Sequence, residues 1–234
     1  MRSSRWQAQG NVYLVAEEPL TPEVVREQVG DADGILEVRA RGSDWIEVTI
    51  WNPDGSVAEM SGNGTRIAAC WLAERTGAEA VSVRVGPRVV EARLLGDGLV
   101  EQRLGPVVVG EPDEIDGIRF TPVDVGNPHA VIEGDLDQLS RLGPLLETHP
   151  RFPDRTNVQV AKRLDANTIE ARVWERGVGE TGASGTSAIA VVAALGVPEA
   201  TVRFPGGDLH VRLDGARALL TGPAERADGG KALS

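Results

Sequence analysis

The sequence predicts an α+β fold built from two similar lobes, each with many short strands and few helices. Two observations lead to this fold class. Strand signals bounded by turn residues recur along the chain, and only four segments suit helices. In addition, two stretches about half the chain apart repeat one another. The 234 residues, 41% of them hydrophobic, are enough for one large domain or two small ones.

The strand signals begin clearly at residues 45–51, where WIEVTIW alternates polar and apolar residues and stops at the turn sequence NPDG. Further strands are expected at 81–85, 89–95, 107–109, 130–132, 157–161, 169–174, 201–204 and 209–213. Helices are expected at 22–29, 64–74, 136–146 and 186–195. This excess of strands over helices indicates the α+β class.

The internal repeat precedes two of the expected helices. Residues 59–65 (EMSGNGT) and 180–186 (ETGASGT) share an acidic residue, a Ser-Gly pair and a threonine, and each leads into an Ala/Ile-rich helix. Ser61 and Ser184 are 123 positions apart, which indicates duplication of one lobe. We expect a first lobe of residues 1–106 plus 219–234, completed by the returning C-terminal segment, and a second lobe of residues 107–218.

Charge and composition narrow the function classes. A net charge of −11 disfavours nucleic-acid binding, although a helix end still attracts a small anion locally. The longest apolar run is about half the length of a membrane span. The first residues show no apolar leader, so a cytoplasmic location is expected. A single cysteine excludes an intrachain disulfide, and the three scattered histidines suggest no metal site.

The two Ser-Gly pairs are the main evidence for the chemistry of the expected site. A serine before a helix is commonly an N-cap, and one such pair would mean no more than that. Two matched copies followed by small residues let a ligand approach the free N–H groups closely. We expect the helix N-termini that begin at Ser61-Gly62 and Ser184-Gly185 to bind an amino-acid-like molecule between them. They would stabilise negative charge that develops at its α-carbon.

Three polar clusters add to this expected pocket. Gly126-Asn127-Pro128-His129 is expected to close a strand, Thr156-Asn157 to open one, and Trp174-Glu175-Arg176-Gly177 to end one. Each alone is typical of a turn with surface polar residues. Their occurrence together with the Ser-Gly pairs favours one shared site.

These segments resemble the diaminopimelate epimerase family. The similarity covers nearly the whole chain and lies in the following motifs: GNPHAVI (126–132), RFPDRTN (151–157), ERGVGET (175–181), NPDGSVAEMSGNGTR (52–66), PGGDL (205–209) and LTGPA (220–224). The resemblance implies two pseudo-symmetric lobes, each a mixed or antiparallel sheet wrapped around a central helix. It also implies inversion of an amino-acid α-carbon without pyridoxal phosphate, metal or other cofactor.

The resemblance further implies the roles of individual residues. Ser61 and Ser184 occupy the positions of the family's two acid–base cysteines, while His129 and Glu175 match positions that assist catalysis. The substrate-holding positions are matched by Asn11, Asn52, Gly62, Asn63, Asn127, Asn157, Glu175, Arg176, Gly185 and Thr186. The sequence also departs from the family at Val12, where aspartate is usual, and at Gly34, near a position where some members carry a polar side chain. Cys70, two turns into its helix, is expected to pack in the core.

Four functions remain open from the sequence. The first is epimerisation of LL-diaminopimelate to the meso form, a step towards lysine and peptidoglycan, with serines assisted by His129 or Glu175. The second is a related isomerase or dehydratase acting on another amino or imino acid with one base. The third is non-catalytic amino-acid binding, and the fourth is a laboratory Cys-to-Ser variant. Val12 lies outside the catalytic pair, so its departure from the family favours natural divergence over a laboratory variant. The epimerase is the preferred interpretation, with a small-molecule substrate and the family's ability to form homodimers.

Overall fold

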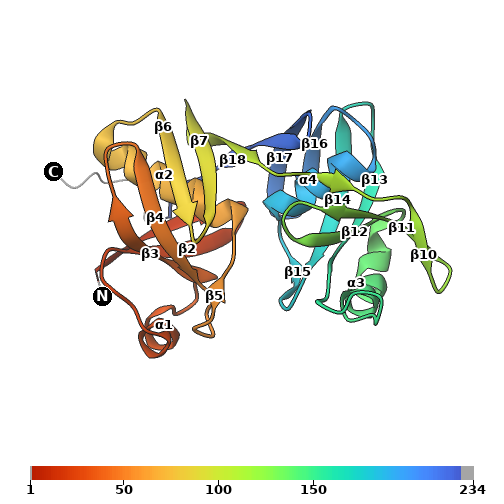
Figure 1. The fold of residues 1–234 in the computed structure, drawn as a ribbon, viewed down its shortest axis with the longest axis horizontal. Coiled ribbons are helices and arrows are strands. Elements are labelled where there is room, and N and C mark those ends of the chain that lie inside the picture. The colour runs from red at the N-terminus through yellow and green to blue at the C-terminus, as the bar shows by residue number, and fades with distance from the viewer. Residues whose placement is uncertain (1, 228–234) are drawn as a thin grey trace. The chain divides into compact units, whose positions relative to one another are not determined.

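The computed structural model describes residues 2–227 and divides them into two compact units (Figure 1). Unit 1 holds the described residues up to Gln102 together with those from Thr221 onward, and unit 2 is Arg103–Leu220. The chain passes from unit 1 to unit 2 within β8 (Leu99–Leu104) and returns within β18 (Arg217–Pro223). The C-terminal segment therefore belongs to the first unit.

Unit 1 contains one mixed sheet. Its main strands, in order across the sheet, are β1 (Ser3–Ala8), β2 (Asn11–Ala16), β3 (Gly34–Arg41), β4 (Trp45–Trp51), β6 (Ala80–Val85) and β7 (Arg88–Gly96). The successive pairings are antiparallel, parallel, antiparallel, parallel and antiparallel. Two short strands extend it, β5 (Val57–Ala58) on β4 and β19 (Glu225–Arg226) on β1. Helix α1 (Pro22–Gln28) connects β2 to β3, and α2 (Gly62–Thr76) follows β5.

Unit 2 repeats this arrangement strand for strand. Its main strands are β11 (Ile118–Asp124), β12 (Pro128–Glu133), β13 (Asn157–Arg163), β14 (Thr168–Glu175), β16 (Glu199–Phe204) and β17 (Gly207–Asp214). They pair in the same alternation of antiparallel and parallel neighbours. The short strand β15 (Gly179–Thr181) pairs with β14, while β9 (Val108–Val109) and β10 (Asp113–Ile115) pair with β11. A 3-10 turn, η1 (Leu136–Gln138), and α3 (Leu139–Glu147) connect β12 to β13, and α4 (Gly185–Ala194) follows β15.

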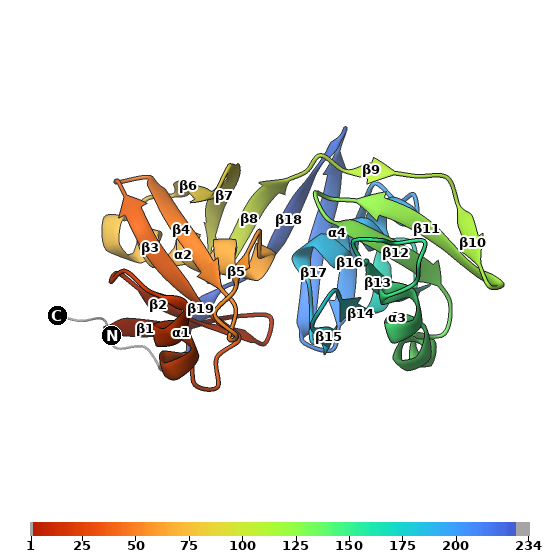
Figure 2. The same ribbon diagram turned by 60° about the horizontal axis from the view of Figure 1, so that its bottom comes forward.

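The strand register shows that the two units are copies of one design. Ile35 on β3 faces Trp51 on β4, and Val158 on β13 faces Trp174 on β14. Both residues of the second pair lie 123 positions after those of the first, the same interval that separates Ser61 from Ser184. The predicted α+β fold of two pseudo-symmetric lobes is confirmed, and each unit can be followed separately in Figure 2.

The helices α2 and α4 are the central helices of their units. Each packs against several strands of its own sheet, β1, β2, β4, β6 and β7 for α2 and β11 to β14, β16 and β17 for α4. Most side chains of both helices are buried, including Ile189, Val191 and Val192 of α4. Helix α4 is apolar on nearly all sides and must therefore be surrounded by protein, which explains why the sheet of unit 2 wraps around it.

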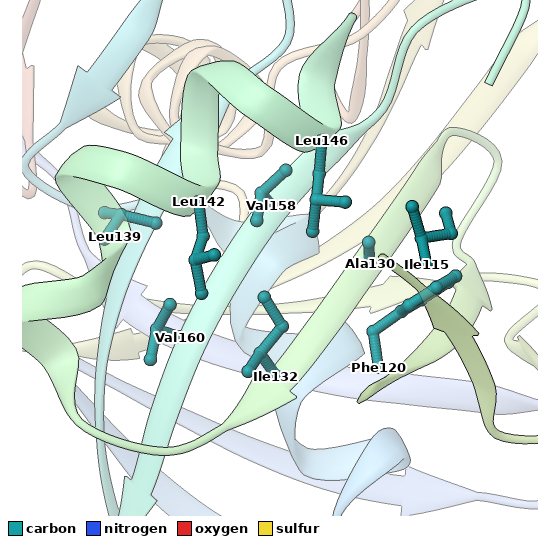
Figure 3. Close-up of a cluster of buried hydrophobic side chains, with 9 residues drawn as sticks. All are labelled: Ile115, Phe120, Ala130, Ile132, Leu139, Leu142, Leu146, Val158 and Val160. Atoms are coloured by element: carbon teal, nitrogen blue, oxygen red, sulfur yellow. The ribbon is translucent and has the colours of Figure 1, made fainter. Parts of the chain in front are cut away.

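The peripheral helix α3 shows how the sequence builds the core of unit 2. Leu139, Leu142 and Leu146 are spaced three and four residues apart, so they lie on one face of the helix. Figure 3 shows these leucines facing Val158 and Val160 of β13, with Ala130, Ile132, Phe120 and Ile115 beside them. Burying one such leucine contributes about 1.5–3 kcal/mol, so α3 is held by its apolar face.

All four expected helices and all nine expected strands are present, and none of their ends is shifted by more than three residues. One local expectation was wrong. Gly126 and Asn127 form the turn after β11, and Pro128 and His129 open β12 instead of closing a strand. In residues 2–227 no helix combines the length and apolarity that a membrane crossing requires.

Candidate active site

Ser61 is the N-cap of α2 and contacts a phenol. Its Oγ accepts a hydrogen bond from the Gly64 N–H at 3.0 Å, and its carbonyl oxygen accepts one from Thr65 Oγ1 at 2.9 Å. The Tyr13 hydroxyl lies 3.2 Å from the same Oγ. The Ser61 hydroxyl is therefore fixed at the electropositive end of the helix with an ionisable partner beside it.

Tyr13 reaches Ser61 because the neighbouring strand carries a glycine. Tyr13 on β2 lies opposite Gly34 on β3, and its side chain is 9% exposed. A Cβ atom at Gly34 would lie 2.8 Å from Tyr13 Cε1 and 2.5 Å from the carbonyl oxygen of Trp51, both too close for an ordinary contact. The absence of a side chain at Gly34 thus provides the space for the Tyr13 ring.

The predicted residues Asn11 and Asn63 meet beside Ser61. Asn63 Nδ2 donates to Asn11 Oδ1, and Asn63 Oδ1 accepts from Arg66 Nη2. The Arg66 side chain is fully buried and also donates to the carbonyl oxygens of Gly62 at 3.3 Å and Pro223 at 3.4 Å. Burial lowers the pKa of Arg66 to about 10. Arg66, which the sequence reasoning did not include, fixes the orientation of the Asn63 amide.

Ser184 is the N-cap of α4, but its hydroxyl is used differently. It makes no cap bond to a backbone N–H within the described chain, and instead it helps to lower the pKa of the Glu175 carboxyl at the end of β14. Thr181 Oγ1 donates to Glu175 Oε1 at 2.5 Å. Burial raises the pKa of Glu175, and the hydrogen bonds from Thr181 and Ser184 oppose that rise. The site thus places a carboxylate of increased basicity near a serine at a helix N-terminus.

His129 is a buried, neutral imidazole with both nitrogens in use. Gln159 Nε2 donates to its Nδ1 at 3.0 Å and to Ser187 Oγ at 2.9 Å. The proton is consequently on Nε2, which donates to Asn127 Oδ1 at 3.0 Å. Burial, together with the charge of Arg176, lowers the pKa of His129 to about 3, although the Gln159 bond acts in the opposite direction. His129 thus orients the Asn127 amide.

The remaining predicted residues occupy turns and helix ends. Asn157 Oδ1 accepts from the Arg176 backbone N–H at 3.0 Å, and Asn157 Nδ2 donates to the Pro128 carbonyl oxygen at 2.8 Å. Gly185 and Thr186 form the first turn of α4. In unit 1, Gly62 begins α2, and Asn52 stabilises the turn after β4 by donating to Ser56 Oγ at 2.9 Å.

Cys70 takes no part in this chemistry. Its Sγ donates to the Ala224 carbonyl oxygen at 3.5 Å, and burial raises the pKa of the thiol to about 11. A thiol of that pKa is almost entirely protonated at neutral pH. Across residues 2–227, no three His, Cys, Asp or Glu side chains gather in a group that could hold a metal ion.

Sequence reasoning missed Tyr13, Gln159 and Thr181. Tyr13 has a signal in hindsight: Gly10-Asn11-Val12-Tyr13 parallels Gly126-Asn127-Pro128-His129, so Tyr13 occupies in unit 1 the place of His129 in unit 2. The strand pairs agree with this correspondence. Tyr13 faces Gly34, and His129 faces Asn157, the residue 123 positions after Gly34. Gln159 had no such signal, because its unit 1 counterpart is the apolar Leu36.

Solved structures define the fold class to which both units belong. A predicted epimerase from Pseudomonas aeruginosa matches with a TM-score of 0.77 at 14% identity, covering 100% of this chain and 99% of the other. A hydroxyproline epimerase from Agrobacterium vitis with bound trans-4-hydroxy-L-proline matches with a TM-score of 0.68 at 15% identity, covering 96% and 88%. The fold is therefore that of these epimerase structures.

The sequence identifies the family within this fold. The diaminopimelate epimerase family model matches residues 16–109 and 121–227. A diaminopimelate epimerase from Pelotomaculum thermopropionicum is 40% identical over 233 residues, covering 86% of this chain and 83% of that protein. Another from a Synechococcus species is 38% identical over 260 residues, covering 94% and 89%. The chain belongs to the diaminopimelate epimerase family, a family of isomerases.

Proposed function

We propose that this protein is a cofactor-independent epimerase that converts LL-diaminopimelate to the meso isomer, with serines in place of the usual thiols. The observation that supports this most directly is the Glu175–Ser184 pair at the N-terminus of α4. Alone, a serine is too weakly acidic or basic to exchange an α-proton. A carboxylate whose pKa is raised by burial supplies the missing base.

In this proposal the unit 2 pair removes the α-proton. The α-carbon C–H bond breaks, its proton passes to Ser184 Oγ, and the Ser184 hydroxyl proton passes to a Glu175 oxygen. The electron pair of the broken bond moves into the substrate carboxylate, giving an enediolate. The free N–H groups in the first turn of α4, including those of Gly185 and Thr186, would stabilise this charge.

Ser61 is assigned to the second face of the α-carbon. An epimerase must return a proton on the face opposite to removal, and Ser61 has a helix N-terminus and a hydroxyl in the matching place of unit 1. Epimerisation also requires the reverse direction, in which Ser61 removes the proton and Ser184 returns it.

Substrate recognition is proposed from the family positions and their present contacts. Arg176 and the start of α4 would hold one carboxylate, whereas Asn52 and Asn157 would hold the distal amino-acid group. His129 acts in this scheme by orienting Asn127, because its own ring is neutral and fully bonded. The proposal places the protein in the cytoplasm, in the route to lysine and peptidoglycan, with the ability to form a homodimer.

The test is incubation with LL-diaminopimelate in deuterium oxide. Loss of the α-proton is followed by NMR, and the stereoisomers are separated by chiral chromatography. The matched control is the variant Ser61→Cys/Ser184→Cys. Deuterium uptake together with the meso isomer in the serine protein would support the proposal. Activity in the cysteine variant alone would show an epimerase pocket that serine does not serve, and inactivity of both would reject the substrate.

A second candidate follows from the difference between the two serines. Ser184 has a carboxylate partner, while Ser61 has a phenol, so the unit 2 pair offers the only carboxylate base in this scheme. One base suffices for an isomerase that shifts a double bond or for a dehydratase acting on an amino or imino acid. Product analysis separates the candidates, since a dehydratase forms a double bond and the epimerase forms only a stereoisomer.

A further inference from the structure

Among the groups that contact the Ser61 hydroxyl, Tyr13 is the one that can ionise. The two oxygens are 3.2 Å apart, within hydrogen-bonding distance, and the Gly64 N–H occupies one Ser61 lone pair at 3.0 Å. If the Tyr13 hydroxyl donates to Ser61 Oγ, the Ser61 proton is free to point towards a ligand. This order of donors is the one that a proton relay from phenol through serine requires.

Three features separate this arrangement from ordinary core packing. Tyr13 stands at the unit 1 position that corresponds to His129 in unit 2. The ring reaches Ser61 only because Gly34 lacks a side chain. A phenylalanine would fill the same buried space, so packing alone does not explain the hydroxyl, which meets a serine at a helix N-terminus.

We propose that Tyr13 is the proton donor and acceptor that serves Ser61, as Glu175 serves Ser184. This inference rests on the proposed epimerase function. It resolves the weakness of serine as an acid or base, because each serine then relays a proton to an ionisable group in its own unit. The two partners differ in kind, a phenol in unit 1 and a carboxylate in unit 2.

The proton balance can be written for one turnover. When Ser61 protonates the α-carbon, its O–H bond breaks and a C–H bond forms with the electron pair of the enediolate. The Tyr13 O–H bond breaks and its proton restores the Ser61 hydroxyl, leaving a phenolate near the N–H groups that begin α2. Water then returns a proton to Tyr13 and accepts one from Glu175, which restores the starting state.

The relay predicts a specific pH profile. For proton removal by the unit 2 pair, Glu175 must be ionised and Tyr13 must be protonated. Activity in that direction should therefore fall at high pH as Tyr13 ionises. The substitution Tyr13→Phe should lower the activity and remove this alkaline limb, because no phenol remains to titrate.

A double-mutant comparison distinguishes proton relay from packing. Tyr13→Phe should lower inversion by about 10²–10⁴-fold in the natural serine protein, the usual contribution of general acid–base catalysis. In the Ser61→Cys background the same substitution should have little effect, because a thiol carries its own acidic proton. Equal losses in both backgrounds, or no loss in the serine protein, would overturn the role of Tyr13 and leave the epimerase proposal intact.

A second measurement does not depend on turnover. Tyr13 is the only tyrosine of the chain, so tyrosinate absorbance reports its ionisation alone, with Tyr13→Phe as the blank. We expect Tyr13 to ionise reversibly in the folded protein, and its pKa to rise in Ser61→Ala, which removes a hydrogen-bond donor to the phenolate. A Tyr13 that ionises only on unfolding would refute the relay, even if the protein proved inactive on diaminopimelate.

Discussion

Gln159 Nε2 donates to His129 Nδ1 across 3.0 Å, which fixes the buried imidazole as the neutral form with its proton on Nε2. Histidine is often the acid or base of an enzyme, and its position in the family motif suggested that role here. Its contacts in this structure favour a positioning role. Its Nε2 proton holds Asn127 Oδ1, so the donor end of that amide is left for other groups.

The first prediction concerns stability at acid pH. The pKa of His129 is about 3 in the folded protein and about 6.5 in an unfolded chain. Between these values the unfolded state binds a proton that the folded state does not, so the free energy of unfolding falls as pH decreases. The slope is about 1.4 kcal/mol per pH unit. Urea unfolding of the natural protein and of His129→Gln at several pH values should give a difference in unfolding free energy that changes with this slope.

Glu175 changes the free energy of unfolding with pH in the opposite direction, so the His129 effect must be measured by comparing two proteins. Its raised pKa means that the folded state binds the extra proton above the unfolded value of about 4.3, so its contribution to stability falls as pH rises there. Both proteins retain Glu175, and the difference between them isolates His129. Parallel stability curves for the natural protein and His129→Gln would contradict the buried neutral histidine.

The second prediction concerns Thr181, which tunes the proposed base. Its hydroxyl donates to Glu175 Oε1 at 2.5 Å and so lowers the pKa of that carboxyl. Thr181→Val keeps the shape of the side chain but removes the donor. The acid limb of the kcat/KM profile, which reports ionisation of Glu175, should move to higher pH. Ser82→Ala is a suitable control, since it removes a hydroxyl that donates to an exposed carboxylate, Glu91, outside the site. An unchanged acid limb in Thr181→Val would mean that Glu175 is not the titrating base.

Much of the fold was predictable because local patterns agree with tertiary structure. The alternating residues of β4 and the leucine spacing of α3 indicate which side chains those elements bury. The N-cap serines indicate where α2 and α4 begin. Ten of the nineteen described strands were not expected from the sequence. Strand β3 is one of them, because it begins with Gly34 and carries three charged residues, Glu37, Arg39 and Arg41. Glu37 is buried because both of its carboxylate oxygens are bonded, one to Arg39 Nη1 at 2.6 Å and the other to Trp51 Nε1 of another strand at 2.8 Å.

The site was predictable in its residues but not in their roles. Ser61 and Ser184 look alike in sequence, yet one hydroxyl caps its helix and the other serves a carboxylate. That difference comes from neighbours on other strands, Tyr13 for Ser61 and Glu175 for Ser184, which the local sequence does not specify. For the same reason, nothing near His129 in the chain indicates that Gln159 fixes its tautomer.

The third prediction uses this difference between the two serines. Ser61 Oγ accepts the Gly64 N–H, whereas Ser184 makes no comparable cap bond in the part of the chain described here. Removal of an N-cap oxygen costs about 1 kcal/mol. Thermal unfolding should therefore show Ser61→Ala destabilised by about that amount, with Ser184→Ala affected less. If Ser184→Ala proves the more destabilising, the two hydroxyls do not have the roles assigned here.

The fourth prediction concerns the space that Gly34 leaves for Tyr13. In Gly34→Ala the new Cβ would meet the Trp51 carbonyl oxygen at 2.5 Å and Tyr13 Cε1 at 2.8 Å. The ring and the backbone must move, at a cost of about 1–3 kcal/mol for an overpacked site. We expect a lower melting temperature and, because Tyr13 is displaced from Ser61, loss of inversion.

Gly134→Ala is the matched control for this change. Its Cβ would meet only Ile132 Cγ2 at 4.0 Å, an ordinary contact, and its backbone is outside the left-handed region that favours glycine. That substitution should be neutral or slightly stabilising, since alanine restricts the unfolded chain. Melting temperatures and tyrosinate titrations of the two variants give the comparison. A Gly34→Ala protein as stable as Gly134→Ala, with an unchanged Tyr13 titration, would show that the ring does not depend on the missing side chain.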